Sequence, residues 1–274
     1  MPAIDDLRAL LDRQRHVLER SEPGVRDGGD PEELHRFRVA TRRSRALIRA
    51  SRPLVRDQLA ALDRELRWLG GATSEVRDLD VLIGHLRALV PLLDPDQAGA
   101  EEIVWAHEQE RKSARNGLLA AIETDRFRGL MRRFSETVPG LYSSDGHASV
   151  ARLARKELER LRTAYDTLEP DASDNDIHEV RIRAKHARYA AELAATTAGA
   201  RFEDLAEALA RVQDVIGEHQ DAVVAEQRVR EFATDESRLA AGRIVEHERR
   251  LRCEARAALP DAMRRVARRA DRAF

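Results

Sequence analysis

The amino-acid sequence predicts an all-α protein, a tandem duplication of four-helix bundles packed together with pseudo-twofold symmetry. Three observations support this prediction. Aromatic residues make up only 4% of the chain, while Ala, Leu, Arg and Glu dominate, which is typical of an aliphatic, helical core. No segment alternates apolar and polar residues for long enough to form a strand. The third observation is an internal repeat that divides the 274 residues into two similar halves.

The repeat keeps one register over a long stretch of chain. HRFRVATRRSR at 35–45 and HEVRIRAKHAR at 178–188 share the pattern H-x-x-R-V/I-x-x-R/K-x-x-R, and His35 lies 143 positions before His178. The same offset aligns residues 61–82 with 204–225, and an offset of 141 aligns 111–118 with 252–259. We therefore predict a single domain over 1–274, built of a first half at 1–140 and a second half at 147–274 that meet in the loop 138–149.

In the first half, apolar periodicity predicts helices near 3–20, 31–51, 55–90 and 98–124, then a short helix near 126–136. The segments EPGVRDGGDP, SRP and VPLLDPD separate them. Asp30 before Pro31 is typical of a helix start, with the proline in the first turn. Gly70-Gly71 indicates a kink or close helix packing in the third helix. Trp68 and Trp105 recur at helical spacing with leucines, which predicts that both lie in the core.

In the second half, the same reasoning predicts helices near 147–168, 174–197, 202–232 and 235–270, separated by EPDASDND and TTAGA. Asp174 is expected to start its helix as Asp30 does. Each half thus contains the helices of a four-helix bundle, and the natural architecture is two bundles packed together.

Composition and charge narrow the class of protein. The only cysteine, Cys253, excludes an internal disulfide and fits a reducing compartment. MPAIDDLRALL does not have the pattern of a signal peptide, and the most apolar stretch, Val81–Leu93, is too short and polar to cross a bilayer. We expect a cytoplasmic protein. The formal net charge is −1, so only the placement of the arginines can indicate a polyanion as partner.

The repeated motif places its positive charges on one face of a helix. At 100° per residue, the first copy forms a stripe within an arc of roughly 80°, beside an apolar face. The members of this first stripe are His35, Arg38, Arg42, Arg45 and Arg49. The second stripe consists of His178, Arg181, Lys185 and Arg188. Like charges one turn apart destabilise an isolated helix by about 0.2–0.5 kcal/mol per pair, so the stripes need a counter-charge.

The spacing of the residues does not decide between two sources of that counter-charge. No acid occurs from Arg36 to Arg56, so acids on a neighbouring helix would have to neutralise the first stripe. The candidates are Glu75, Asp78, Asp80, Glu218 and Asp221, some of which recur at the same register in both halves. The other source is an anionic ligand. Arginine forks suit phosphate oxygens, and a rise of about 5–6 Å per turn suits a repeating anion, so the second source favours a linear polyanion.

Other chemistries find little support in the sequence. None of the nine histidines lies in an HExxH motif, and His178 and His186 straddle arginines, so no metal site is predicted. Cys253 has no partner for nucleophilic catalysis, and Gly70-Gly71 lacks the Gly-Lys-Ser/Thr of a phosphate-binding loop. Specific nucleic-acid binding is disfavoured, because the chain has no recognition module and few aromatic residues for stacking. No cofactor is expected.

The two motif pairs, HRFRVATRRSR with SEVRDLDVL and HEVRIRAKHAR with GEHQDAVVA, resemble those of the CHAD family over nearly the whole chain. The resemblance implies two four-helix bundles whose basic stripes surround a central surface that binds inorganic polyphosphate. It also implies association with polyphosphate granules, and some members accompany CYTH triphosphate-processing enzymes. It implies no catalytic activity, and so the protein is expected to be non-enzymatic.

Carried over to this chain, the resemblance assigns phosphate contacts to His35, Arg38, Arg42 and Arg45 in the first half, and to His178, Arg181, Lys185 and Arg188 in the second. Further candidates are Arg43, Arg49, Arg77 and Arg183, while Asp78 and Asp221 are expected to orient the arginines. Glu179, Glu192 and Gln220 replace basic residues of the first copy, which predicts an asymmetric site that is stronger on the first-half side.

Two other functions compete with polyphosphate binding. In the first, the protein is a phosphoanhydride-processing enzyme, or an accessory to a triphosphate-processing enzyme, that acts through the same basic cleft. The enzyme would need a metal, which the five acids named above would hold. In the second, the stripes are neutralised internally and the protein is a structural scaffold. Under that second alternative, Arg42→Ala would reduce stability and leave binding unchanged.

Overall fold

The computed structural model of the protein describes residues 2–28, 30–144, 149–169 and 171–274. Within these ranges all regular structure is helical, which confirms the predicted all-α class. The first half contains α1 (Pro2–Asp27), α2 (Pro31–Val55), α3 (Ala60–Leu89), the 3-10 turn η1 (Val90–Leu92), α4 (Gln97–Ile122) and α5 (Asp125–Thr137). The second half contains α6 (Val150–Asp166), α7 (Asp174–Ala198), α8 (Ala200–Phe232) and α9 (Arg238–Ala273).

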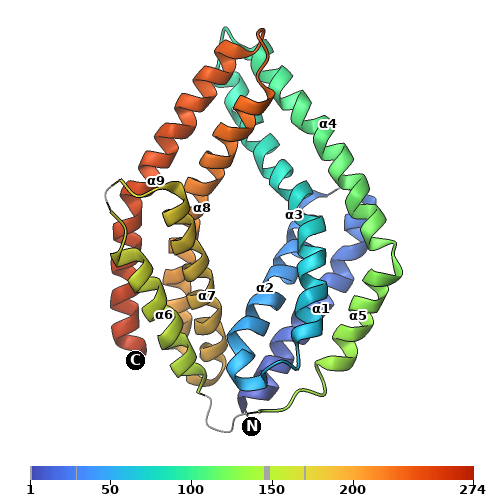
Figure 1. Cartoon of the computed structure of the whole chain (residues 1–274), viewed down its shortest axis with the longest axis vertical. Helices are drawn as coiled ribbons and strands as arrows, with labels where there is room; N and C mark the ends of the chain where they lie inside the picture. Colours follow the sequence, from blue (N-terminus) through green and yellow to red (C-terminus); the bar gives the residue numbers. More distant parts are fainter. Residues whose placement is uncertain (1, 29, 145–148, 170) are drawn as a thin grey trace.

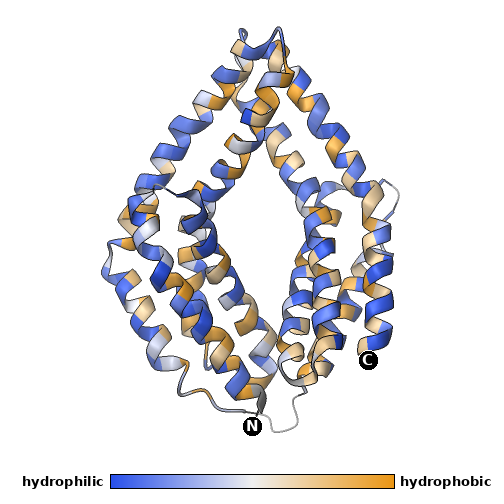
Figure 2. Ribbon diagram, turned by 180° about the vertical axis from the view of Figure 1, so that it is seen from behind, coloured by the Kyte–Doolittle hydropathy of each residue, from blue (hydrophilic) through white to orange (hydrophobic). Residues whose placement is uncertain are grey.

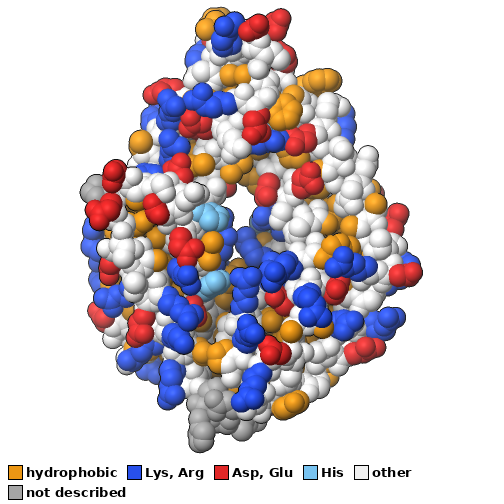
Figure 3. Space-filling model, in the orientation of Figure 1, with side chains coloured by type: hydrophobic (Ala, Val, Ile, Leu, Met, Phe, Trp, Pro, Cys, Tyr) orange, Lys and Arg blue, Asp and Glu red, His pale blue; other side chains and the backbone are white. Residues whose placement is uncertain are grey.

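The two halves meet at two places and enclose an opening between them. At the lower end of Figure 1, α2 and α1 pack against α7. At the upper end, α4 packs against α9 and α8. A space-filling view shows that side chains do not close the space between these junctions (Figure 3). The opening is therefore bordered by both halves, as the placement of the two stripes requires. Pseudo-twofold symmetry between the halves stays a prediction.

The core of the protein is aliphatic, as the composition predicts. Leu7, Leu66 and Leu209 are among the fully buried side chains, and Phe37 and Phe202 are among the largest of them. Hydrophobic and hydrophilic residues alternate around the long helices, so each helix buries one face and exposes the other (Figure 2). In the part of the chain that the structure describes, no helix combines the length and apolarity needed to cross a membrane.

Two helices continue past prolines that the sequence suggests as boundaries. Helix α1 runs through Pro23 to Asp27, and α2 runs through Pro53 to Val55. Burial of Val25 at the end of α1, and of Leu54 and Val55 at the end of α2, explains the extra turns. The predicted ends at 20 and 51 are therefore wrong, because apolar packing outweighs the local cost of the proline.

Other details of the prediction also change. Helix α3 is continuous through Gly70-Gly71, so the glycines cause no break, and it starts at Ala60 rather than near 55. Trp105 is 61% exposed, so its predicted core position is wrong, whereas Trp68 packs partly buried against the core. Residues 145–148, within the predicted junction loop and the expected start of the sixth helix, lie outside the described residues.

Candidate anion-binding site

Arg residues of the first stripe and Lys185 of the second stripe line one cavity, whereas Arg181 and Arg188 are not among its lining residues. Helices α2 and α7 pack against each other, and a cavity of about 480 Å³ lies beside their contact. Its walls include Arg38, Arg42, Arg45 and Arg49 from α2, Arg67, Gly70 and Gly71 from α3, and Lys185 and His186 from α7. Lys and Arg side chains gather at the rim of the central opening and continue below it (Figure 3). Helices α2 and α7 thus bring members of both stripes to one cavity, and Lys185 is the contribution of the second stripe to its wall.

Two features of α2 orient its basic stripe toward the cavity. They are the cap at the start of the helix and the apolar face that the helix buries. Asp30 caps the helix by accepting a hydrogen bond from the Glu32 amide at 2.8 Å, as the sequence predicts, and Pro31 follows in the first turn. On the opposite face Phe37 is buried, and the hydroxyl of Thr41 donates to the Phe37 carbonyl at 3.0 Å. Because that face packs in the core, the basic residues lie on the outward-facing side of the helix.

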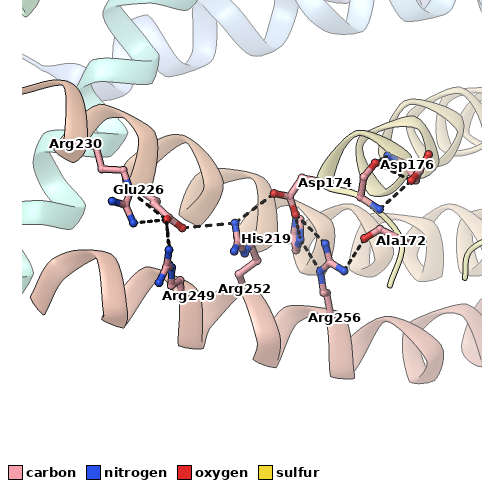
Figure 4. Close-up of polar contacts among 10 residues, drawn as sticks. Ala172, Asp174, Asp176, His219, Glu226, Arg230, Arg249, Arg252 and Arg256 are labelled. Atoms are coloured by element: carbon pink, nitrogen blue, oxygen red, sulfur yellow. Dashed lines mark hydrogen bonds and ion pairs between the residues drawn. The ribbon is translucent and has the colours of Figure 1, made fainter. Parts of the chain in front are cut away.

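Helix α7 is held at its N-terminus by a polar network. Ser173 caps the helix, and Ser173 and Asp176 form a reciprocal capping box, so Asp174 is the first helical residue rather than the predicted cap. Asp174 accepts hydrogen bonds from Arg256 at 2.8 Å and from Arg252 at 3.2 Å, both on α9 (Figure 4). These bonds connect the start of the second stripe to α9.

His219 on α8 completes this network as a neutral group. It is 1% exposed, and its Nε2 accepts a hydrogen bond from Arg256 at 3.1 Å (Figure 4). Burial lowers its pKa to about 4, against the opposing effect of Asp174. Because the unfolded chain binds a proton here near pH 6.5, lowering the pH from 6.5 to 4 favours the unfolded state.

We therefore expect the free energy of unfolding to fall more steeply between pH 7 and pH 5 in the wild type than in His219→Gln, by up to about 2 kcal/mol. Urea unfolding at the two pH values measures this difference. His16→Gln, at an exposed position, is the matched control and should behave as the wild type does. Parallel pH dependence in the wild type and His219→Gln would contradict the proposed neutral state.

At the centre of the site, four cations from both halves lie close together. They are Arg38 and Arg42 of α2 and Arg181 and Lys185 of α7, which influence one another electrostatically. Arg38 donates to Asp78 at 3.0 Å, whereas Arg42 and Arg181 form no hydrogen bond or ion pair with the described residues. The Nε atoms of Arg38, Arg42 and Arg181 are buried and have no hydrogen-bond acceptor among the described residues. Buried donors of this kind are costly unless a ligand or water supplies the acceptor.

The electrostatic consequences are seen in the pKa values. Burial, together with Arg181, Arg42 and Arg38, lowers the pKa of Lys185 to about 7. Burial also lowers the pKa of Arg38 and of Arg181, against the attraction of Asp78 and Asp221 respectively. The pKa of Asp221 is raised, because the surrounding protein desolvates its carboxylate more than Arg181 stabilises it. The two acids predicted to orient the arginines thus act on the central cations, but they offset only part of the positive charge.

The histidines that open the two motifs differ in their surroundings. Burial lowers the pKa of His35, and the nearby Arg77, Arg42 and Arg38 lower it further. His178 donates from Nδ1 to the Gln220 side chain at 2.8 Å. Gln220 stands where the first half has Arg77, so the second copy replaces a cation with a neutral acceptor. Neither histidine lines the 480 Å³ cavity. They lie beyond it, at the N-terminal ends of the stripes.

Other predicted site residues are neutralised by acids. Arg45 donates to Asp63 at 3.2 Å. Glu192 accepts from Arg188 at 2.9 Å and, across the junction of the halves, from Arg43 at 3.2 Å. Arg183 pairs with Glu179 at 2.6 Å. Arg49 instead contacts the ring of His186 at 3.4 Å, which supplies no negative charge. The site therefore has a central group with unmet hydrogen-bonding capacity and a periphery in which acids compensate Arg43, Arg45, Arg183 and Arg188.

The predicted neutralising acids are only partly correct. Asp78 pairs with Arg38, but Asp80 instead pairs with Arg111 on α4. Sequence reasoning missed Asp63, because its partner Arg45 is 18 positions away on a different helix. Among the described residues, the five acids of the enzyme alternative do not form a group of three with metal-ligand spacing.

The fold and the cavity together define an all-α protein with a basic, two-sided cavity. The sequence profile of the CHAD domain matches residues 9–230. The protein belongs to the CHAD family.

Comparisons with individual proteins agree with this assignment. PptA from Streptomyces chartreusis has a similar structure, with a TM-score of 0.74 and 21% identity, covering 96% of this chain and 100% of that one. The crystal structure of the CHAD domain from the plant Ricinus communis also gives a TM-score of 0.74, with 25% identity over 97% of this chain and 92% of that one.

Two proteins of Mycobacterium tuberculosis are similar in sequence, the uncharacterized protein MT2285 of strain CDC 1551 / Oshkosh and the uncharacterized protein Rv2226 of strain ATCC 25618 / H37Rv. Each is 28% identical over 214 residues, which cover 72% of this chain. The chain spans about 39% of the length of these curated relatives.

Proposed function

We propose that the protein binds inorganic polyphosphate, without hydrolysing it, in the basic cavity between its two halves. The observation that carries the proposal is the central group of Arg38, Arg42, Arg181 and Lys185. Three of these side chains have a buried guanidinium Nε with no acceptor among the described residues. Phosphate oxygens supply both the negative charge and the acceptors that this group needs.

The shape of the basic surface favours a linear polyanion over a small metabolite. Members of the α2 stripe follow one another at one-turn spacing, and the basic surface continues from the opening along the junction of the halves (Figure 3). A chain of phosphates can contact several of these residues in sequence. The CHAD resemblance of the motifs supports polyphosphate as the particular polyanion, association with polyphosphate granules, and a CYTH-type enzyme as a candidate partner.

The scaffold alternative explains the periphery of the site better than its centre. Asp63 and Glu192 compensate Arg45, Arg43 and Arg188, as a structural network would. Arg42 and Arg181 have no such partner in the described parts of the chain. Binding measurements separate the two functions.

The test is a salt titration of long-chain polyphosphate binding with duplex DNA as competitor. We expect the affinity to fall steeply with salt, because bound counterions are released, and to resist DNA. Arg38→Ala/Arg42→Ala should weaken binding by at least about 100-fold, since each removes charge-assisted hydrogen bonds. Equal binding by this double variant and the wild type, or no binding at low salt, would show that the stripe has a structural role and does not bind polyphosphate. Phosphate release measured with and without Mg²⁺ tests the enzyme alternative, and release that depends on the presence of the protein would support it.

A steric variant adds a second arm to the same titration. A Cβ on Gly71 would meet no atom within 4 Å, so Gly71→Leu adds a side chain to the cavity wall without removing a charge. Gly117→Leu, also in open space but on α4 away from this cavity, is the matched control. Weaker binding in Gly71→Leu alone would locate the polyphosphate in the cavity.

A further inference from the structure

A second group of functional side chains lies where α3 approaches α9, away from the basic cavity. One potential ligand atom from each of His85, His247 and Glu248 lies within 4.8 Å of the others. His85 belongs to the first half, and the other two belong to the second half. The sequence does not suggest this group, because His85 and Glu248 are 163 positions apart. Neither half contains an HExxH motif that would point to it.

The carboxylate of Glu248 is incompletely satisfied. The side chain is only 1% exposed. His85 Nε2 donates to its Oε1 at 2.6 Å, but the buried Oε2 has no hydrogen-bond donor among the described residues. A buried carboxylate with one of its two oxygens unpaired raises the free energy of the folded protein. A cation between the three side chains would satisfy it.

We propose that His85, His247 and Glu248 form a binding site for a divalent transition metal, specifically Zn²⁺. Two imidazole nitrogens and one carboxylate match the donors that Zn²⁺ accepts, and they leave a fourth tetrahedral position for water or an anion. Mg²⁺ and Ca²⁺ prefer oxygen ligands only, so this donor set disfavours them. Binding would displace the proton that His85 Nε2 shares with Glu248, since a coordinating imidazole must be neutral at that nitrogen.

The location gives the site a structural consequence. A metal held by α3 and α9 would cross-link the two halves on the upper side of the opening, opposite the α2–α7 junction (Figure 1). His85 also lies two turns beyond Asp78 on the same face of α3, so the link would stiffen the helix that supplies Asp78 to the basic site. In the repeat register, Arg228 and His107 occupy the positions equivalent to His85 and Glu248, so the second copy does not reproduce the ligand set.

One neighbouring cation opposes metal binding. The guanidinium of Arg250 lies 2.9 Å from His247 Nδ1, on a side chain that is 64% exposed. Arg250 can therefore turn into solvent, but its charge lowers the affinity of the site for a cation. Arg250→Gln should bind Zn²⁺ more tightly than the parent protein.

The experiment measures Zn²⁺ binding to the full-length, tag-free protein by competition with a chromogenic chelator. A Cys253→Ser parent removes the exposed thiol as another zinc ligand. We expect one Zn²⁺ per chain, and at least about tenfold weaker binding in His247→Ala and in Glu248→Gln, since loss of even an outer-shell partner commonly costs this much. His16→Ala, at an exposed histidine on α1, should leave the affinity unchanged. Co²⁺ in place of Zn²⁺ should give visible absorption bands of a four- or five-coordinate ion.

His247 is half-exposed, so His247→Ala is not expected to unfold the protein, and Zn²⁺-dependent thermal stabilisation checks folding in each variant. Stabilisation by Zn²⁺ in the parent, absent from His247→Ala, would support the site. Zn²⁺ binding that disappears in the Cys253→Ser parent, or equal affinity in His247→Ala and the parent, would overturn the proposal. Polyphosphate binding is measured separately, so the two proposals can fail independently.

Discussion

Replacement of Arg42 by methionine is expected to weaken polyphosphate binding by about 10- to 100-fold and to stabilise the unliganded protein. Arg42 lies beside Arg38, Arg181 and Lys185, and it has no ion-pair partner in the described residues. Its charge therefore raises the free energy of the folded, unliganded state. Methionine retains much of the apolar stem and removes the repulsion, which is expected to raise the melting temperature by about 2 °C.

Calorimetric titration with polyphosphate and a thermal melt of the same sample measure both effects. Arg13→Met is the matched control, because it removes the same charge from an exposed position on α1 that does not line the cavity. It should change neither property appreciably. Loss of stability in Arg42→Met with unchanged affinity would instead identify the cations as part of a structural network, as the scaffold alternative requires.

Polyphosphate affinity is expected to rise as the pH is lowered from 9 to about 7, by up to tenfold per pH unit. Lys185 titrates near pH 7 in the unliganded protein, because burial and the neighbouring arginines disfavour its ammonium form. Bound phosphates would favour that form and raise the pKa, so binding takes up a proton in this range. In the unliganded protein, the lowered pKa of Lys185 makes the free energy of unfolding change with pH in the opposite direction to the affinity. The stability contributed by this group increases from pH 7 to about 10.5, where the unfolded chain releases the proton.

Lys185→Arg tests the assignment, because arginine stays charged throughout this range. The variant should bind polyphosphate with a flatter pH dependence above pH 7 and comparable affinity at pH 6.5. The measurement is the dissociation constant at fixed ionic strength across the range. An unchanged slope in Lys185→Arg would show that a different group takes up the proton.

Much of the site was predictable because it depends on helical periodicity. The spacing of Arg38 and Arg42 places them on one face regardless of the rest of the fold, and the repeat predicts a second stripe with Arg181 and Lys185. The capping residue Asp30 was predictable for the same reason, since caps act within one turn. Conversely, the ends of α1 and α2 were not predictable from local signals, because burial of Val25, Leu54 and Val55 outweighs the prolines.

The sequence alone was sufficient to determine the all-α class, the duplication and the two basic stripes, since these follow from composition, register and a helical period. Only the tertiary structure decided which charges remain uncompensated. Asp63 and Glu192 form ion pairs with peripheral arginines, whereas Arg42 and Arg181 form no ion pair with the described residues and lie close to other cations. It also brought His85 to Glu248 across the two halves. The physical reason is that pairing and desolvation depend on distances between side chains of different helices, which sequence spacing within one helix does not specify.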